Sequence, residues 1–401
     1  MGGSMTNKLG LRDLDVNGKR VLVRVDFNVP MDGKRIADNT RIRAALPTIL
    51  ELIRGGAKII LITHLGRPKG FDPHFSTEPL AVALSKLLGQ RVKHIVDCIG
   101  VEVEGVVSEL RAGDVLLLEN VRFYEAEAKN VPEFARKLAS LADLYINDAF
   151  GAAHRAHAST EGVTHYFDQC AAGLLMEKEI EYLGKVLHDP ERPFVAILGG
   201  AKISDKIGVI ENLLDKVDQL IIGGGMAYTF LKAKRLSIGD SIVEMDKLDL
   251  ANELLRKASD RDLTIHLPQD HVIGREFDPN TEFQVVSNKN IPDGWSGFDI
   301  GSETVAKFGE IVDTAKTVIW NGPLGVYEFE QFAKGTLEIA QRVAESAAVS
   351  IIGGGDCVAA VHQAGVADRI THISTGGGAS LEFLEGKRLP GIEALTDRSE
   401  N

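Results

Sequence analysis

The chain has 401 residues, enough for two domains, and its 44% hydrophobic and 25% charged residues are ordinary for a globular protein. Its formal net charge of −12 disfavours nucleic acid or an anionic membrane as the main partner, so any anion site must be a local basic cluster. No apolar run approaches the length of a membrane span.

The cysteines and the N-terminus favour a reducing compartment. Cys98, Cys170 and Cys357 are odd in number and far apart, and they form neither a CxxC pair nor a zinc spacing. Residues Met1–Ser4 (MGGS) are typical of an expression-tag remnant, and nothing at the N-terminus resembles a signal peptide. We therefore expect a cytoplasmic protein.

The first half of the chain alternates predicted strands with predicted helices. A helix is expected from about Asn39 to Gly55, and Pro47 must either kink it or begin a second segment. This alternation predicts a parallel sheet that gathers its strand-end loops along one edge. The strands are predicted over Arg20–Val25, Lys58–Thr63, Asp114–Leu118 and Leu144–Asn147.

Arginines follow these strands where each one ends. Arg67, Arg122 and Arg155 occupy equivalent positions after three strands, and Arg41 comes just after the loop of the first. Arginine forks match carboxylate and phosphate, so the pattern predicts an anion site, although surface arginines are common without a ligand. Three histidines stand beside them, His64, His154 and His157. The HRAH run at 154–157 has a possible metal spacing but no third ligand nearby, so we expect no metal there.

The stretch FVAILGGAKISDK (Phe194–Lys206) opens the second half. A buried strand over Phe194–Leu198 runs through two glycines into a helix that Ser204 is expected to cap. Lys202 precedes this cap and Lys206 lies in the first turn, where the helix dipole disfavours cations unless an anion offsets them. The alternative is two solvated lysines at an ordinary helix start. A helix is predicted over Met176–Leu187, before this stretch. The HDPERP segment (188–193) directly after that helix is the expected interdomain connection.

The same order of strand, glycine run and helix start recurs three more times, at Ile221–Phe230, Ser350–Ala360 and His372–Leu384. Glycines let a backbone approach phosphate closely, so four such turns predict a phosphate-rich ligand. Asp356 suits a magnesium ion on those phosphates, although an acidic residue at a helix start is also stabilised by the dipole alone. Glu328 is a candidate acceptor for a ribose hydroxyl. Further strands are expected at Leu263–Leu267 and Thr317–Trp320.

The two halves together favour phosphoryl transfer between a nucleotide and a small anion. The chain has no GxxxxGK[ST] and no GxGxxG pattern, which disfavours a standard P-loop NTPase and a dinucleotide-binding protein. A carboxylate acceptor needs no general base because it is already ionised at neutral pH. Catalysis would then rest on alignment and on neutralising charge at the moving phosphoryl group.

At this point the motifs, taken together and in order, resemble the phosphoglycerate kinase family along essentially the whole chain after Met5. They are RVDFNVP (Arg24–Pro30), HLGRP (His64–Pro68), ENVRF (Glu119–Phe123), DAFGAAHRAH (Asp148–His157), LGGAK (Leu198–Lys202), GGGMAYTF (Gly223–Phe230), NGPLGVYEFE (Asn321–Glu330), GGGD (Gly353–Asp356) and STGGGASLEFLEGK (Ser374–Lys387).

The resemblance implies an α/β fold of two Rossmann-like domains, each a mostly parallel sheet flanked by helices, joined by a helical hinge. It implies an N-terminal domain over 5–175, a hinge over 176–193, a C-terminal domain over 194–388, and a return of 389–401 to the first domain. The implied glycolytic reaction passes the acyl phosphate of 1,3-bisphosphoglycerate to ADP, with Mg²⁺, after the hinge closes. A monomer is expected.

The resemblance also implies site residues. Arg41 and Lys202 would stabilise the transferring group, assisted by Gly377 and Gly378. The phosphoglycerate would be held by Asp26, Phe27, Asn28, Arg41, His64, Leu65, Gly66, Arg67, Arg122 and Arg155. The nucleotide would be held by Gly200, Ala201, Lys202, Lys206, Gly224, Gly297, Asn321, Glu328, Gly354, Gly355, Asp356 and Cys357, with Asp356 on the metal.

One position departs from the family, which usually has Ser or Thr after GGGD where this chain has Cys357. A thiol is a much weaker donor, so the backbone N–H is expected to serve instead. Its place at a helix start predicts a reactive thiol that bound nucleotide shields. Two alternatives stay open: a two-lobed binding protein for a phosphorylated metabolite, and a dehydrogenase on a similar fold.

Overall fold

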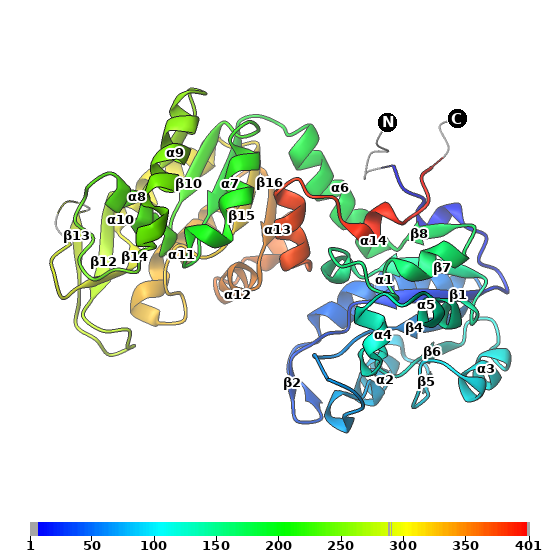
Figure 1. The fold of residues 1–401 in the computed structure, drawn as a ribbon. Coiled ribbons are helices and arrows are strands. Elements are labelled where there is room, and N and C mark those ends of the chain that lie inside the picture. Colours follow the sequence, from blue (N-terminus) through cyan, green and yellow to red (C-terminus); the bar gives the residue numbers. More distant parts are fainter. Residues whose placement is uncertain (1–6, 288, 290, 399–401) are drawn as a thin grey trace. The chain divides into compact units, whose positions relative to one another are not determined.

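A computed structural model describes residues 7–287, 289 and 291–398 of the chain (Figure 1). It divides into two compact units. The first takes the described residues up to Gly184 together with those from Arg388 onward, and the second runs from Lys185 to Lys387. The tag remnant expected at Met1–Ser4 and the outer domain bounds at 5 and 401 lie outside the described residues.

The first unit is built on a six-stranded parallel sheet in the order β5-β6-β4-β1-β7-β8. Val21, Leu22 and Val23 of the inner strand β1 are fully buried, as expected where helices cover both faces of a parallel sheet. The strands are β1 (Arg20–Val25), β4 (Lys58–Ile62), β5 (Val92–His94), β6 (Val115–Leu117), β7 (Leu144–Asp148) and β8 (Cys170–Ala172), and a hairpin of β2 (Met31–Asp32) and β3 (Arg35–Ile36) follows β1.

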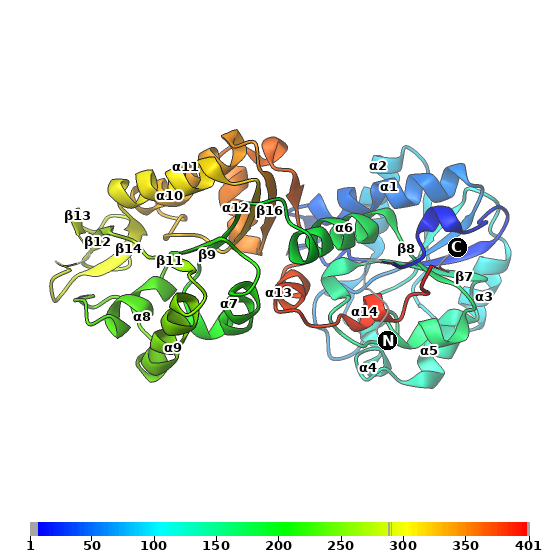
Figure 2. The same cartoon turned by 90° about the horizontal axis from the view of Figure 1, so that it is seen from above.

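Helices pack on both faces of this sheet, with α1 and α2 on one face and α4 and α5 on the other (Figure 2). Pro47 lies inside α1, which is one continuous helix, so the alternative of a second segment starting at Pro47 is wrong. Buried Ile42 and Ile49 of α1 join Val21 and Val23 in the core. The helices are α1 (Thr40–Arg54), α2 (Glu78–Leu88), α3 (Val101–Ser108), α4 (Glu125–Ala128), α5 (Pro132–Ala139), α6 (Leu174–His188) and α14 (Pro390–Glu393).

The second unit has its own six-stranded parallel sheet, in the order β11-β10-β9-β15-β16-β17. Its strands are β9 (Phe194–Leu198), β10 (Gln219–Ile222), β11 (Thr264–His266), β15 (Thr317–Asn321), β16 (Val349–Gly353) and β17 (His372–Ile373). A three-stranded antiparallel sheet in the order β13-β12-β14, which the sequence did not predict, is formed by β12 (Asp270–Gly274), β13 (Phe283–Ser287) and β14 (Ser296–Ile300).

Seven α-helices lie in the part of the second unit that the structure describes. Trp320 of β15 is fully buried in a core with Phe308 of α10 and Ile339 of α11. The two parallel sheets flanked by helices confirm the predicted fold class. The helices are α7 (Ile207–Leu213), α8 (Met226–Ala233), α9 (Leu248–Ser259), α10 (Ser302–Thr314), α11 (Glu330–Glu345), α12 (Gly355–Gln363) and α13 (Gly378–Leu384).

All four glycine turns connect a strand to a helix as predicted, from β9, β10, β16 and β17. The prediction that Ser204 caps the first of these helices is wrong. A 3₁₀ turn over Ile203–Asp205 comes first, and α7 begins after Lys206, which is its N-cap residue without a side-chain capping bond. The serine therefore lies one turn too early to reach the first N–H groups of α7.

The two ends of the described chain pair with each other in the first unit. The Leu9 N–H donates to the Thr396 carbonyl (2.8 Å), and the Thr396 N–H donates to the Cys170 carbonyl at the edge strand β8 (3.0 Å). The Lys8 ammonium forms an ion pair with Asp397 at 2.7 Å. The described N-terminal and C-terminal segments thus extend the same edge of the sheet.

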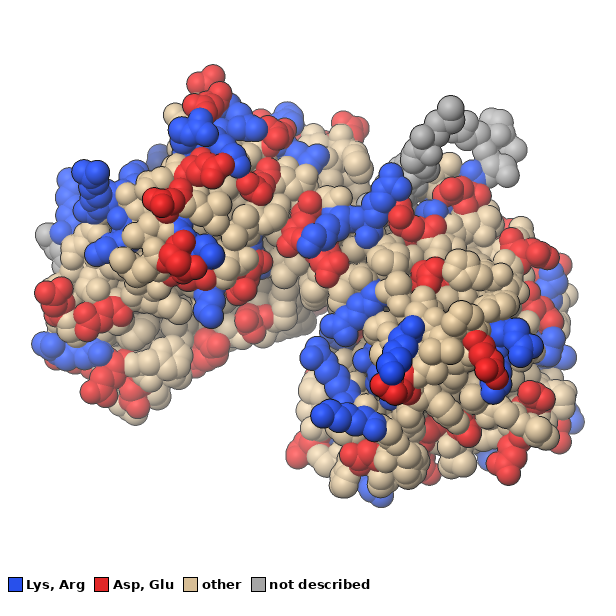
Figure 3. All heavy atoms as spheres, viewed as in Figure 1, with Lys and Arg blue, Asp and Glu red and all other residues tan. Residues whose placement is uncertain are grey.

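On the face of each unit drawn in Figure 3, basic side chains alternate with acidic ones. This face therefore offers no continuous basic surface of the kind that nucleic acid requires. In the described part of the chain, every helix is too short or too polar to span a bilayer.

Candidate functional site

The loops after β1 and β4 are tied together at the carboxyl edge of the first sheet. Asp26 accepts a hydrogen bond from Arg41 Nη1 at 2.9 Å through one carboxylate oxygen and from the Asn28 N–H at 3.2 Å through the other. Asn28 Oδ1 in turn accepts from the Gly66 N–H at 2.8 Å, and the Phe27 N–H donates to Thr63 Oγ1. Two sequence-distant motifs therefore form one rigid corner.

Asn120 joins the loop after β6 to this corner. Its side-chain oxygen accepts from the N–H groups of Leu65 (3.2 Å) and Arg122 (3.0 Å), while its amide donates to the Leu65 carbonyl (2.8 Å). Gly66 follows Leu65 in this loop and has φ +63°. A side chain there would be strained and would also overlap the ring of Phe75. The order of the strands thus brings the loop motifs of β1, β4 and β6 side by side.

The predicted arginines gather in this region. Burial lowers the pKa of Arg122, and the positive charges of Arg24, Arg155 and Arg67 lower it further against the opposing field of Glu127. Buried Nε of Arg122 has no hydrogen-bond partner among the described residues. Clustered like charges that shift a pKa point to a functional site, here one for an anion.

Two histidines of this cluster, His64 and His157, have lowered pKa values, which favours their neutral forms. Burial lowers the pKa of His64 well below its ordinary value, with Arg24, Arg122, His157 and Arg41 acting in the same direction. Burial, and next the positive charge of Arg122, lower the pKa of His157 to about 4. The positive charge of the cluster is therefore carried by its arginines.

Arg24 is a member of this cluster that the sequence analysis missed. It lies inside β1 with a fully buried side chain, and it donates through Nε to Ser159 Oγ (2.8 Å) and through Nη2 to His64 Nδ1 (3.0 Å). Its Nη1 also donates to the Val25 carbonyl. The arginine inside an otherwise apolar strand, RVLVRV, was the available signal.

In the second unit, the turns after β9, β10 and β15 contact one another. The Gly200 N–H donates to the Pro323 carbonyl, and the Met226 N–H at the start of α8 donates to the Gly200 carbonyl, both at 3.0 Å. Gly224 has φ +66°, and a Cβ there would lie 2.7 Å from the Gly200 nitrogen. Only glycine fits this approach, which leaves the backbone bare for a ligand.

Lys206 is nearly buried between these turns and donates to Asn321 Oδ1. Burial lowers its pKa, while Asp205, Asp356 and the Cys357 thiol oppose that change. The Asn321 amide nitrogen has no partner among the described residues, and a Cβ on Gly354 would lie 3.2 Å from it. Asn321 thus links the lysine to the turn at Gly354. Lys202 and Ala201, by contrast, are exposed.

Asp356 and Cys357 diverge at the start of α12. Asp356 is exposed, whereas the Cys357 side chain is fully buried in the core with Trp320 and Ile352. Burial raises the pKa of the Cys357 thiol far above its ordinary value. The predicted reactive thiol is therefore wrong, because desolvation of the thiolate outweighs the helix dipole.

The remaining predicted nucleotide residues lie on separate elements of the second unit. Gly297 of β14 packs on α8, since a Cβ there would overlap the Tyr228 hydroxyl. Glu328 is exposed between β15 and α11. Burial raises the pKa of Tyr327, and the charges of Asp356 and Glu328 raise it further. Gly377 has φ +51° and precedes Gly378, the first residue of α13.

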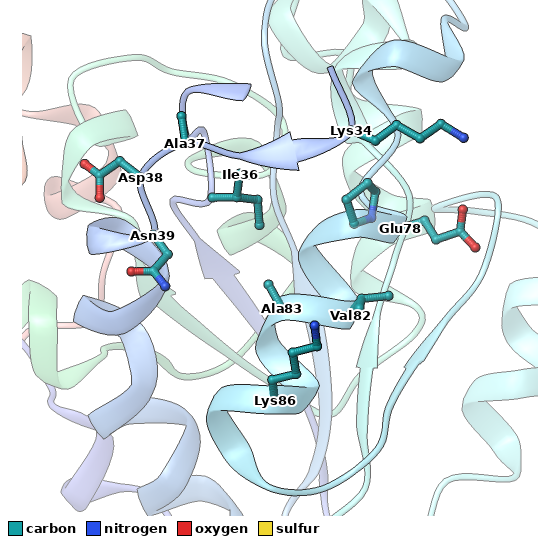
Figure 4. Close-up of a pocket in the computed structure, with 10 residues that line it drawn as sticks. Lys34, Ile36, Ala37, Asp38, Asn39, Glu78, Val82, Ala83 and Lys86 are labelled. Atoms are coloured by element: carbon teal, nitrogen blue, oxygen red, sulfur yellow. The ribbon is translucent and has the colours of Figure 1, made fainter. Parts of the chain in front are cut away.

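No group of three or more metal-ligating side chains occurs within the described residues. A hollow of about 640 Å³ in the first unit is lined by none of the predicted site residues (Figure 4). Lysines, acids and apolar side chains line it together, among them Lys34, Ile36, Asp38, Glu78, Val82 and Lys86. This mixed lining indicates no single ligand chemistry.

The structure has two α/β units, each built on a parallel sheet. One unit carries an arginine cluster, and the other carries glycine turns, a buried lysine and an exposed aspartate. Together these features define a class of phosphoryl-transferring enzymes. The family description "Phosphoglycerate kinase" matches residues 11–387. The chain belongs to the phosphoglycerate kinase family, and it is therefore a kinase and a transferase of glycolysis. This finding confirms the predicted resemblance, function and enzyme class, and it excludes the binding-protein and dehydrogenase alternatives.

Relatives cover almost the whole chain. It is 59% identical to the phosphoglycerate kinase of Moorella thermoacetica over 392 residues, which span 98% of this chain and 100% of that protein. It is 57% identical to a cytosolic phosphoglycerate kinase of Nicotiana tabacum over 391 residues, 96% of this chain and 98% of that protein. A solved structure of phosphoglycerate kinase from Coxiella burnetii matches with a TM-score of 0.89 and 42% identity, covering 96% of this chain and 98% of that one.

Proposed function

We propose that the protein catalyses the reversible transfer of the acyl phosphate of 1,3-bisphosphoglycerate to ADP, giving 3-phosphoglycerate and ATP. The observation that carries this proposal is the arginine cluster at one sheet edge, with the buried and unpartnered Nε of Arg122 among the described residues. Such a cluster suits a small ligand that bears both a carboxylate and a phosphate.

The phosphoglycerate would be held by the N-terminal domain, which we propose over 5–175 with 389–401. Asp26 would orient Arg41 through their 2.9 Å ion pair, and Asn28 would hold the Gly66 turn. Arg67, Arg122 and Arg155 would bind the anionic groups as forks. The other contacts would come from Phe27, His64, Leu65 and Gly66.

The nucleotide would be held by the C-terminal domain, which we propose over 194–388. Lys206 is pre-positioned by Asn321 and would bind a phosphate, with the bare backbone of Gly200, Ala201, Gly224, Gly354, Gly355 and Cys357 beside it. Glu328 would accept from the ribose and Gly297 would line the adenine side. These assignments are supported by the glycine turns that pack against one another.

The exposed carboxylate of Asp356 fits a magnesium ion that arrives on the nucleotide. Mg²⁺ commonly takes one or two protein carboxylates and keeps phosphate and water in its other positions, so the lack of a larger ligand group among the described residues agrees with this role. When bound, the ion would neutralise phosphate charge. Asp356 is the residue that would hold it.

The chemical step would break the bond from phosphorus to the acyl oxygen and form one from phosphorus to the terminal oxygen of ADP, leaving a carboxylate. No proton transfer is needed, because both oxygens are ionised at neutral pH. Arg41 and Lys202 would neutralise the moving group, with the N–H groups of Gly377 and Gly378. Because the two ligands bind to different units, transfer requires the hinge at 176–193 to bring them together.

We further propose a cytoplasmic monomer. The three cysteines are free and buried, as in reducing compartments, and one relative is described as cytosolic, although chloroplastic relatives also occur. Each proposed site draws on one chain only.

A coupled assay tests the proposed function by following ATP formation from ADP and 1,3-bisphosphoglycerate. Turnover that requires both substrates and Mg²⁺ is expected. Binding of phosphoglycerate without ATP formation would refute the catalytic role while leaving the first site in place.

A further inference from the structure

The contact between Arg24 and His64 determines where the imidazole carries its proton. A guanidinium has five N–H donors and no acceptor, so it can only donate to His64 Nδ1, 3.0 Å from Arg24 Nη2. A nitrogen that accepts a hydrogen bond carries no proton, and in neutral imidazole the proton is then on Nε2. Geometry alone therefore selects one tautomer.

We propose that Arg24 is a positioning residue that holds His64 as the neutral Nε2–H tautomer, so that His64 meets phosphoglycerate as a hydrogen-bond donor and not as a cation. The role toward the ligand rests on the proposed function, whereas the tautomer belongs to the protein alone. His64 is half-buried, which leaves part of its ring accessible to a ligand.

Arg24 is itself held by a buried chain of donors that runs in one direction. Its Nε donates to Ser159 Oγ at 2.8 Å. The Ser159 hydroxyl has one proton, and with it donates a hydrogen bond to one Glu127 oxygen at 2.6 Å. The Ser159 N–H donates to the other Glu127 oxygen at 2.9 Å. Glu127, Ser159 and Arg24 are all fully buried, so the guanidinium cannot turn away from His64.

The groups that face His64 disfavour a second proton on its ring. They are the guanidinium groups of Arg24, Arg122 and Arg41 and the imidazole of His157. Two acids of this region are already engaged: Asp26 is paired with Arg41, and Glu127 accepts from the Ser159 hydroxyl. Burial and these cations together lower the pKa of His64 well below its ordinary value.

The same arrangement recurs at a second histidine of the cluster. Arg122 Nη2 lies 3.3 Å from His157 Nδ1, and that nitrogen must accept for the same reason. His64 and His157 thus contribute directed donors, while arginines supply a charge that does not titrate near neutral pH. A neutral donor can approach a bound anion without adding to the repulsion between the cations.

Nuclear magnetic resonance on the ligand-free protein tests the tautomer directly. With ¹⁵N-histidine, two-bond ¹H–¹⁵N correlations distinguish Nε2–H, Nδ1–H and doubly protonated rings, and His64→Gln assigns the signal. We expect the neutral Nε2–H pattern from about pH 6 to pH 8. An Nδ1–H pattern, or protonation of His64 near its ordinary pKa, would overturn the proposal.

Variants test the positioning role. In Arg24→Met, we expect the His64 signal to lose its single-tautomer pattern and titrate at higher pH, whereas Arg20→Gln on the same strand, which loses only a surface pair with Asp143, should leave it unchanged. An unchanged His64 pattern in folded Arg24→Met would refute the role. If Arg24→Met does not fold, the wild-type pattern still decides the tautomer.

Calorimetry with 3-phosphoglycerate separates a donor from a cation at position 64. His64→Gln can accept from Arg24 and still donate to the ligand, so we expect its affinity within about tenfold of wild type. His64→Lys introduces a positive charge that faces the Arg24 guanidinium, and it should bind more weakly than His64→Gln. Tighter binding by His64→Lys would overturn the donor role. Failure of the wild type to bind 3-phosphoglycerate would refute the proposed function without altering the tautomer result.

Discussion

Asp148→Asn should make the first unit more stable than in the wild-type protein at high pH, but not at low pH. Asp148 ends β7 and is fully buried, where one oxygen accepts from the N–H groups of Leu175 (3.0 Å) and Met176 (3.2 Å) at the start of α6. Its other oxygen has no hydrogen-bond partner among the described residues. Burial raises its pKa to about 7, despite the hydrogen bonds from Thr48 and from those backbone groups.

The sign follows from the two pKa values. In the unfolded chain an aspartate ionises above about pH 3.9. In the folded protein Asp148 keeps its proton up to about pH 7, so between these values the folded state binds more protons and stability falls as pH rises. Across about pH 5 to pH 8 the loss is about 3 kcal/mol, and asparagine, which does not titrate, escapes it.

Urea unfolding followed by circular dichroism, at several values between about pH 5 and pH 8, measures this difference. Asparagine keeps the accepting oxygen, so the two proteins should be similar in stability near pH 5 and diverge above it. Asp143→Asn is the matched control, because a hydrogen bond from Arg20 lowers the pKa of Asp143 and its effect should be constant over this range. A stability difference for Asp148→Asn that does not change with pH would refute the reasoning.

Three further predictions concern the proposed reaction. Arg41→Ala should lower kcat by roughly 10²–10³ in a folded protein, by analogy with lost oxyanion donors, and near-normal turnover would contradict its role. Cys357 should resist alkylation in the native protein with or without Mg-ADP and react only after unfolding, because its thiol is fully buried; rapid labelling of the folded protein would show otherwise. The radius of gyration measured by solution scattering should fall when both substrates saturate the protein, and an unchanged value would count against closure of the hinge.

Strand ends were the most predictable part of the site. Apolar runs such as Phe194–Leu198 are bounded by glycines and polar residues, and the structure has β9 with the same bounds. Because all strands of the first sheet are parallel, residues that follow different strands, such as Arg67 and Arg122, had to come to one edge. The loops could therefore be grouped before any contact was known.

Contacts that depend on burial could not be predicted in the same way. Arg24 lies in a strand whose apolar neighbours indicate the core, yet the sequence does not show that Ser159, 135 positions later, accepts a hydrogen bond from it and donates in turn to Glu127. Cys357 was expected at an exposed helix start, but its side chain turns into the core while Asp356 beside it faces outward. Neighbouring positions on a helix point in different directions, so a shift of one position decides which side chain is buried. Tertiary packing sets how the helix is rotated about its axis.

The pairing of the two described chain ends has a consequence for synthesis. On a ribosome, the segment around Leu9 emerges long before its partner Thr396, which lies almost four hundred residues later in the chain. The second unit can complete its sheet as soon as Ile373 is made, whereas the first unit keeps an open edge at β8 until Thr396 is made. The unit that is translated first is thus the last to be finished, and its exposed strand edge is the part of the nascent chain most in need of protection from aggregation.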